Sequence, residues 1–243
     1  TNEGNYGTGT LLFIRDVSAE LSLKAKLEAS DIQLRAALAS ANEGAFSLNL
    51  VTRLGSTRGF INEFLGISSA DATIALERWL EITAEDDRER LAGAFETLRT
   101  QPTQPLDIVF QATRADGEIR WLHMRGKVTE FSRDGQPLRV SGVVADTTER
   151  HDLEARLAAD TDFRVWYERN TRAHKVSGYR SVVVSLKPLL GAPGDITDLQ
   201  MDVVADLAEQ YSFAEIRSTH DQNLVLAEVR KADLYAVWQK LAE

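Results

Sequence analysis

The chain has 243 residues, of which 43% are hydrophobic and 27% charged, with 15 Gly and 5 Pro. This composition is that of a globular protein with one large or two ordinary domains, and it excludes collagen-like and low-complexity chains. The absence of cysteine excludes disulfides, thiolate metal sites, iron–sulfur ligation and thiol nucleophiles. The net charge of −9 repels a nucleic-acid backbone at long range, so we expect no nucleic-acid partner.

The hydrophobic segments of the chain are short. Runs such as residues 181–186 fall far below the roughly 18 apolar residues of a membrane span. Residues 1–7 have neither the basic start nor the apolar stretch of a signal peptide. We therefore expect a cytoplasmic protein with no membrane partner.

Two segments, residues 10–27 and 140–157, share one pattern. Each has a short apolar strand, then an aspartate and a hydroxyl residue that can cap a helix, then a charged amphipathic helix. A repeat of this kind indicates the unit of architecture. We therefore expect residues 1–30 to be the tail of a preceding domain with a connector helix, and residues 31–159 to be a complete domain of the same kind with its exit helix.

The complete domain reads as a helix, two short strands, several short helices and three strands. Two Asp-Gly pairs, Asp116-Gly117 and Asp134-Gly135, supply the positive φ that tight hairpin turns need. The order predicts a five-stranded antiparallel sheet with helices on one side, which is an α+β fold. The strands are expected at residues 46–50, 55–59, 107–114, 119–131 and 138–145.

The longest expected strand has two faces, because side chains alternate along a strand. Leu122, Met124 and Val128 share the face that the helices should cover, and we take them as the lining of any ligand pocket. His123 falls on the outer face, away from such a pocket. His151 falls on the exit helix, where we expect it to be exposed.

Several signals in this region occur in the order found in a known family. Residues 115–122, 133–138 and 142–150 resemble the C-terminal half of a PAS sensor domain. The resemblance covers about residues 31–150, with the tail of a preceding PAS-like domain at 10–30. It implies dimerisation through flanking helices and transmission of a ligand or redox signal to an output domain. The small ligand, if there is one, stays unknown.

The connector helix carries Leu23, Leu27, Leu34 and Ala41 near heptad spacing. Such a stripe fits a signalling helix that forms a dimer, and it also fits a cap packed on its own domain. We favour a homodimer that forms through residues 18–40, because the repeat makes this helix a connector between two domains.

The pattern changes after Asp160-Thr161-Asp162, which should end the exit helix. A β-branched strand at 179–186 is followed by a helix that opens with a Thr197–Gln200 capping box. Two strands around a turn and a last helix complete a β-α-β-β-α order, which predicts a small two-layer sandwich over residues 160–243. We expect the chain to divide into two folding units near residue 160. The apolar face expected on the capped helix comprises Leu199, Val203, Leu207 and Tyr211.

Residues 170–179, 194–197 and 217–224 resemble the ferredoxin-like half-domain of nitrite and sulfite reductases. The resemblance implies that a hairpin binds sirohaem and its anion, with a fixed positive charge and hydrogen bonds from its side chains. The reductases pair two half-domains and hold an iron–sulfur cluster on cysteines. This chain has one half-domain and no cysteine, and Asp221 would repel an anion. The residues that the resemblance implies would contact sirohaem are Arg217, Thr219, Gln222 and Asn223. We favour the alternative that the hairpin is kept by descent and does not assemble a functional sirohaem site.

Three functions are consistent with these patterns. No kinase, cyclase or phosphodiesterase motif follows residue 150, and we expect no catalytic residue and no metal ligand. We therefore favour a noncatalytic PAS-type sensory and dimerisation module of a signalling protein that carries a reductase-like half-domain. One alternative is a fragment or regulated form of a sirohaem nitrite or sulfite reductase. The other is a fusion of two unrelated folding units with neither function intact.

Overall fold

The computed structural model describes residues 18–41, 43–67, 73–187 and 195–242. The chain divides into two compact units, and the change from one to the other falls at Asp146. The second unit also takes in two short strand segments, 109–112 and 119–123. The strand predicted in the first copy of the repeat lies outside the described residues.

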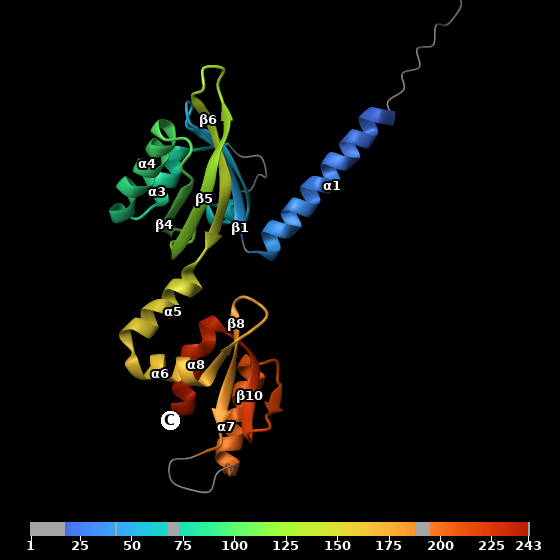
Figure 1. Cartoon of the computed structure of the whole chain (residues 1–243), viewed down its shortest axis with the longest axis vertical. Coiled ribbons are helices and arrows are strands. Elements are labelled where there is room, and N and C mark those ends of the chain that lie inside the picture. Colours follow the sequence, from blue (N-terminus) through green and yellow to red (C-terminus); the bar gives the residue numbers. More distant parts are fainter. Residues whose placement is uncertain (1–17, 42, 68–72, 188–194, 243) are drawn as a thin grey trace, which may run out of the picture. The chain divides into compact units, whose positions relative to one another are not determined.

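The first unit is a mixed sheet-and-helix domain (Figure 1). Its sheet has the strand order β3-β2-β1-β6-β5-β4. The α+β class is confirmed, but the expected count of five strands is wrong, because a short strand, β3, pairs antiparallel with β2. Three residues are too few to show a period of two in the sequence. The elements are α1 (Ser18–Ser40), β1 (Glu43–Asn49), β2 (Leu54–Gly59), α2 (Phe60–Phe64), β3 (Thr73–Ala75), α3 (Leu76–Ile82), α4 (Glu85–Thr100), β4 (Leu106–Thr113), β5 (Ile119–Phe131) and β6 (Pro137–Asp146).

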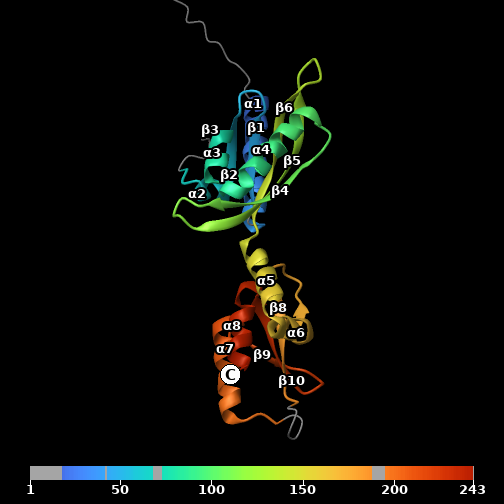
Figure 2. The same ribbon diagram turned by 90° about the vertical axis from the view of Figure 1, so that its left-hand side faces the viewer.

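Helix α4 lies over one face of this sheet (Figure 2), and the sheet and the helix both contribute buried hydrophobic side chains. Leu122 and Met124 of β5 are fully buried and Val128 is nearly so, as the alternation predicted. Phe95 and Leu98 supply the helix side of the same core. The predicted faces of the longest strand are therefore confirmed.

The two Asp-Gly pairs form the hairpin turns that join the last three strands. Gly117 has φ 91° and Gly135 has φ 77°, in the region that favours glycine. The amide of Arg114 donates to the carbonyl of Glu118 at 2.8 Å and closes the first turn. Both turn predictions are confirmed.

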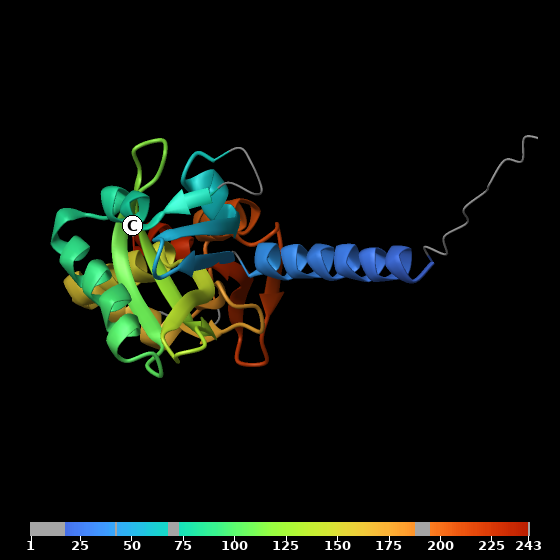
Figure 3. The ribbon, with the colours of Figure 1, turned by 90° about the horizontal axis from the view of Figure 1, so that it is seen from above.

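Helix α1 is a single uninterrupted helix (Figure 3). Leu38, near its C-terminal end, is buried, whereas Leu23 is 70% and Ile32 is 66% exposed. The helix expected over residues 18–40 is therefore present, and part of its apolar surface faces solvent.

The second unit has a four-stranded sheet in the order β7-β8-β10-β9. The predicted β-α-β-β-α order is present as β8, α7, β9, β10 and α8, and a helix and a short edge strand precede it. Strand β7 has three residues, again too few for a pattern. The elements are α5 (Thr148–Ala159), α6 (Thr161–Asn170), β7 (Thr171–Ala173), β8 (Tyr179–Ser185), α7 (Asp198–Tyr211), β9 (Ile216–Ser218), β10 (Asn223–Arg230), η1 (Lys231–Asp233) and α8 (Leu234–Ala242).

Helix α5 contributes to the core of this second unit. Leu153 is buried in one cluster with Phe163 of α6 and Leu226 of β10, and Leu157 packs against that cluster. The predicted helix break is present, because Asp160 is extended and its Oδ1 accepts a hydrogen bond from the amide of Phe163 at 2.9 Å. The break therefore lies inside the second unit, which begins before α5. The division expected near residue 160 stays a prediction for experiments in solution.

Helix α7 begins as predicted and packs with a different face from the one expected. Thr197 and Gln200 form a complete capping box. Leu199 is 73% exposed and Val203 is exposed, whereas Val204, Leu207 and Ala208 are buried. The expected face was wrong because the helix has two overlapping apolar stripes that share Leu207. We expected the stripe with the larger side chains to be buried, and the structure buries the one with Val204 and Ala208.

Candidate functional site

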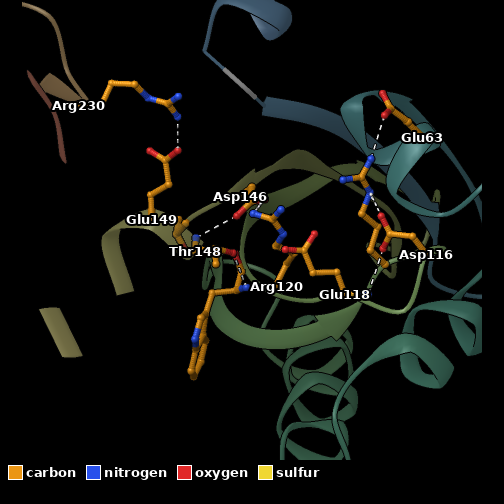
Figure 4. Close-up of polar contacts among 11 residues, drawn as sticks. Glu63, Asp116, Glu118, Arg120, Asp146, Thr148, Glu149 and Arg230 are labelled. Atoms are coloured by element: carbon orange, nitrogen blue, oxygen red, sulfur yellow. Dashed lines mark hydrogen bonds and ion pairs between the residues drawn. The ribbon is translucent and has the colours of Figure 1, made fainter. Parts of the chain in front are cut away.

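The strongest cluster of interactions lies where β6 passes into α5. Strand β6 ends at Asp146, whose Oδ1 accepts a hydrogen bond from the amide of Thr148 at 2.9 Å. The backbone of Trp121 in β5 bonds to both threonines of the junction. Its amide donates to Thr148 Oγ1 at 2.9 Å, and its carbonyl accepts from the amide of Thr147 at 2.8 Å. These bonds fix the first turn of α5 to a central strand (Figure 4).

An ion pair adds to this junction. Arg120 Nη1 lies 3.9 Å from Asp146 Oδ2, and both side chains are half-buried. The same carboxylate stands before the N-terminal end of α5, where the helix dipole favours negative charge. Asp146 is therefore held by a cation, a backbone amide and the helix end together (Figure 4).

The rings of Trp121 and His151 stack at the same place. Their centroids are 4.5 Å apart and their planes are 22° apart. His151 is half-buried, and its Nε2 is buried without a hydrogen-bond partner among the described residues. The expectation that His151 is exposed was wrong, because the outer face of β5 presents Trp121 to this side of the helix. A contact between residues so distant in the chain leaves no local sequence signal.

The other side of α5 makes polar contacts within the second unit. Glu149 Oε1 pairs with Arg230 Nη2 at 2.9 Å (Figure 4). The guanidinium of Arg156 lies 4.7 Å from the ring centroid of Tyr235, and the hydroxyl of Tyr235 donates to Asp160 at 3.3 Å. One helix therefore bonds to β5 through its first turn and to the reductase-like segment along its length.

The interior of the PAS-like sheet holds the residues expected to line a pocket. Leu122, Met124 and Val128 are packed among other buried side chains. A cavity of about 40 Å³ lies between Leu48 and Phe95, and none of the three expected residues lines it. That volume suits a water or two. A more open pocket of about 360 Å³ is lined by residues that include Phe64, Ile82 and Arg114, and none of the three expected residues lines it either. The pocket role of the three residues stays a prediction.

The hairpin expected to contact sirohaem is formed by β9 and β10. The amide of Thr219 donates to the carbonyl of Asn223 at 3.0 Å, and Thr219 Oγ1 accepts from the amide of Asn223 at 3.2 Å. Gln222 occupies the left-handed region with φ 59°. The predicted turn is therefore present, and Thr219 and Gln222 have roles in its geometry.

The cation of this hairpin already has a counter-ion. Arg217 Nε lies 2.7 Å from Glu215 Oε1, with both side chains about half exposed. The hydrogen bond and charge of Arg217 lower the pKa of the Glu215 carboxyl. The pKa of Arg217 is raised, chiefly by Glu215 and also by Glu228. The sequence contained the signal for this pair, since residues two apart on an extended segment share a face.

These residues do not fit a polyanionic cofactor such as sirohaem. The one arginine of the hairpin is paired, and the carboxylates of Glu215 and Glu228 act on it. Asn223 Oδ1 is buried without a hydrogen-bond partner among the described residues. This oxygen is a hydrogen-bond acceptor, so it cannot bond to the carboxylate oxygens of a ligand, which are also acceptors. Whether these side chains contact sirohaem stays a prediction, and their charges argue against it.

Comparisons with known proteins agree with both resemblances. Residues 59–144 match the family model of the PAS fold, and residues 177–243 match that of the nitrite/sulfite reductase ferredoxin-like half domain. Comparison with curated proteins finds no match. The chain therefore contains, in sequence, one segment that matches the PAS fold and one that matches the reductase half domain.

Three solved structures are similar to part of the chain. A sensory box histidine kinase/response regulator from Burkholderia thailandensis has 21% identity and a TM-score of 0.44, with 55% of this chain and 98% of that chain covered. The N-terminal domain of a diguanylate cyclase with PAS/PAC sensor from Marinobacter aquaeolei has 17% identity and a TM-score of 0.40, with 45% and 98% covered. A PAS domain from Colwellia psychrerythraea has 14% identity and a TM-score of 0.38, with 54% and 98% covered.

Across the described parts of the chain, no helix combines the length and the apolar character that a membrane span needs.

Proposed function

We propose that this chain is a noncatalytic PAS-type sensory and dimerisation module, in which α5 relays a change in the PAS sheet to the reductase-like half-domain. The observation that carries the proposal is that α5 has two sets of partners. Thr148 bonds to Trp121 of β5, and Leu153 lies in the core with Phe163. The matches to the PAS fold and to the half-domain support the same assignment.

The relay follows from the contacts of the first turn of α5. A ligand or partner that moves β5 must change the two backbone bonds of Trp121 or carry α5 along with them. Because Leu153 is buried in the half-domain core, a displaced α5 costs packing there. The two regions are therefore coupled through an element whose position both of them determine.

Hydrogen exchange on the full chain tests this relay. Met124→Ala leaves a cavity in the PAS core, so it should destabilise the sheet around it. If α5 relays the change, amides of β8 and β10 should exchange at least about threefold faster in this variant. Adding Thr148→Val should weaken that effect, because it removes the hydroxyl that bonds to Trp121.

The control for this test is Thr97→Val in α4, which removes an exposed bond to the carbonyl of Gly93. It should leave the exchange of β8 and β10 unchanged. Unchanged exchange of those strands in Met124→Ala, with faster exchange in the PAS sheet, would show that α5 relays nothing.

The match of residues 177–243 favours one other function, that of a fragment or regulated form of a sirohaem reductase. The visible absorption spectrum of the purified chain distinguishes the two. The sensory proposal allows a colourless protein or the bands of a haem or flavin, whereas sirohaem bands would favour the reductase.

A further inference from the structure

We propose that Glu215 is a built-in counter-ion that keeps Arg217 from binding external anions. Arg217 Nε and Glu215 Oε1 are 2.7 Å apart, which is a charge-assisted hydrogen bond. Glu215 thereby takes the Nε donor and offsets the positive charge that would attract a carboxylate or oxyanion to the remaining N–H groups. The inference concerns the hairpin alone and does not depend on the sensory role proposed above.

The pair follows from the local backbone. Glu215 immediately precedes β9, and Arg217 is the middle residue of that strand. Residues two apart in extended backbone project to the same side, so the carboxylate and the guanidinium meet with little loss of freedom. In the β9–β10 ladder Arg217 is opposite Val225, which offers it no polar partner. Glu215 therefore supplies the acceptor that the ladder partner does not.

The charges around Arg217 also oppose an anion. Glu228 of β10 raises the pKa of Arg217, which places its negative charge within electrostatic reach of the guanidinium. Asp221 lies in the turn of the same hairpin, and its side chain is exposed. Two carboxylates, those of Glu215 and Glu228, therefore act on this one cation, and Asp221 adds a third negative charge to the hairpin that an incoming anion approaches.

The neutral side chains of the hairpin carry no charge with which to offset these carboxylates. Thr219 Oγ1 accepts the amide of Asn223 and so stabilises the turn. The buried atom of Asn223 that lacks a partner is Oδ1, an acceptor that cannot bond to an oxyanion. Replacing Glu215 with a neutral residue is therefore the substitution that should make Arg217 available to an external anion.

Sulfate titration of the full chain, followed by NMR at low ionic strength, tests the role of Glu215. The amides of β9 and β10 and the Arg217 Nε–H signal report binding. In the unmodified chain these signals should move no more than those of other exposed residues. In Glu215→Gln they should move together, with an apparent affinity about fivefold higher. That factor corresponds to removing one unit charge about 4 Å away in water.

Two further variants complete the experiment. Glu215→Gln/Arg217→Gln should lose the gain, because the cation is gone. Glu209→Gln makes the same charge change at an exposed position of α7 and should not create the response. Sulfate binding by the unmodified hairpin would overturn the inference. So would the lack of a gain in Glu215→Gln, or an equal gain in Glu209→Gln.

Discussion

Trp121 of β5 and His151 of α5 stack with their ring centroids 4.5 Å apart and their planes within 22° of each other. The same tryptophan bonds through its amide to Thr148 Oγ1, one turn before the histidine. Side-chain and backbone contacts therefore hold the first turns of α5 to one strand residue. A stacked pair of this kind contributes about 0.5–1.5 kcal/mol beyond the area that it buries.

Substitution of His151 separates the value of the stack from the cost of its buried nitrogen. His151→Ala should lower the free energy of unfolding by about 1 kcal/mol, because the ring contact is lost. His151→Phe keeps a ring and removes the Nε2 that has no partner, so it should be more stable than His151→Ala and at least as stable as the parent.

Urea denaturation measures these differences. His220→Ala, at an exposed turn position, should change the free energy of unfolding by less than about 0.5 kcal/mol. A phenylalanine variant no more stable than the alanine variant would show that the stack contributes nothing.

Thr148→Val tests the backbone bond at the same junction. Valine has nearly the shape of threonine and cannot accept the amide of Trp121, which is left without its partner. The loss should be about 1–2 kcal/mol in the free energy of unfolding. Thr97→Val, on the exposed side of α4, should cost less than about 0.5 kcal/mol. Equal effects of the two substitutions in urea denaturation would contradict a special role for Thr148.

Leu153→Ala tests whether α5 belongs to the core of the second unit. Leu153 is nearly fully buried, so its truncation should cost about 2–4 kcal/mol and should raise hydrogen exchange in α6 and β8. Leu199→Ala makes the same change at a side chain that is 73% exposed and should cost less than about 0.5 kcal/mol. If amides of α6 and β8 keep their protection in Leu153→Ala, the unit begins near residue 160 as the sequence suggested.

Local chemistry determined which features were predictable from sequence. The turns at Gly117 and Gly135 require positive φ, which the Asp-Gly pairs predict. The alternation that buries Leu122 and Met124 can be recognised from neighbouring residues alone. The class of fold and the order of most strands follow from such signals. Strand β7 has only three residues, too few to show a period, and the sequence of α7 carries two overlapping apolar stripes between which periodicity does not choose.

The sites were less predictable than the fold. His151 was expected to be exposed because its partner, Trp121, is distant in the chain and lies on another element. The hairpin with Arg217 was located correctly from its resemblance to a family. Its charge balance depends on Glu215 and Glu228, which that resemblance does not include. The sequence therefore did not indicate two kinds of contact: those between side chains on different elements, and those between a motif residue and a residue outside the motif.

The pH dependence of Glu215 gives a direct test of its pairing. Arg217 lowers the pKa of the Glu215 carboxyl below its ordinary value near 4.5, first through the hydrogen bond and then through its charge. A depressed folded-state pKa means that the pair adds stability above the ordinary value. This contribution is lost as the pH falls through the lower folded-state value. The side-chain carbon of Glu215, followed by NMR, should titrate below 4.5, and Arg217→Gln should return the midpoint upward. An unchanged midpoint would show that the pair does not form in solution.

Self-association through α1 is the last prediction. Leu23 is 70% and Ile32 is 66% exposed on this helix, and burying such side chains against a second copy gains about 25 cal/mol per Å². Leu27→Glu/Leu34→Glu places charges on the heptad stripe and should convert a dimer to a monomer in analytical ultracentrifugation.

The matched control for this prediction is Ala29→Glu/Ala36→Glu, which adds two glutamates with the same spacing at exposed positions off the stripe. A dimer held by the stripe should survive that change, because the new charges stay in solvent and the apolar surface is intact. Monomerisation by both double variants would indicate general repulsion between highly acidic copies. A parent chain that is monomeric at high concentration would contradict the dimer itself and leave α1 as a cap on its own domain.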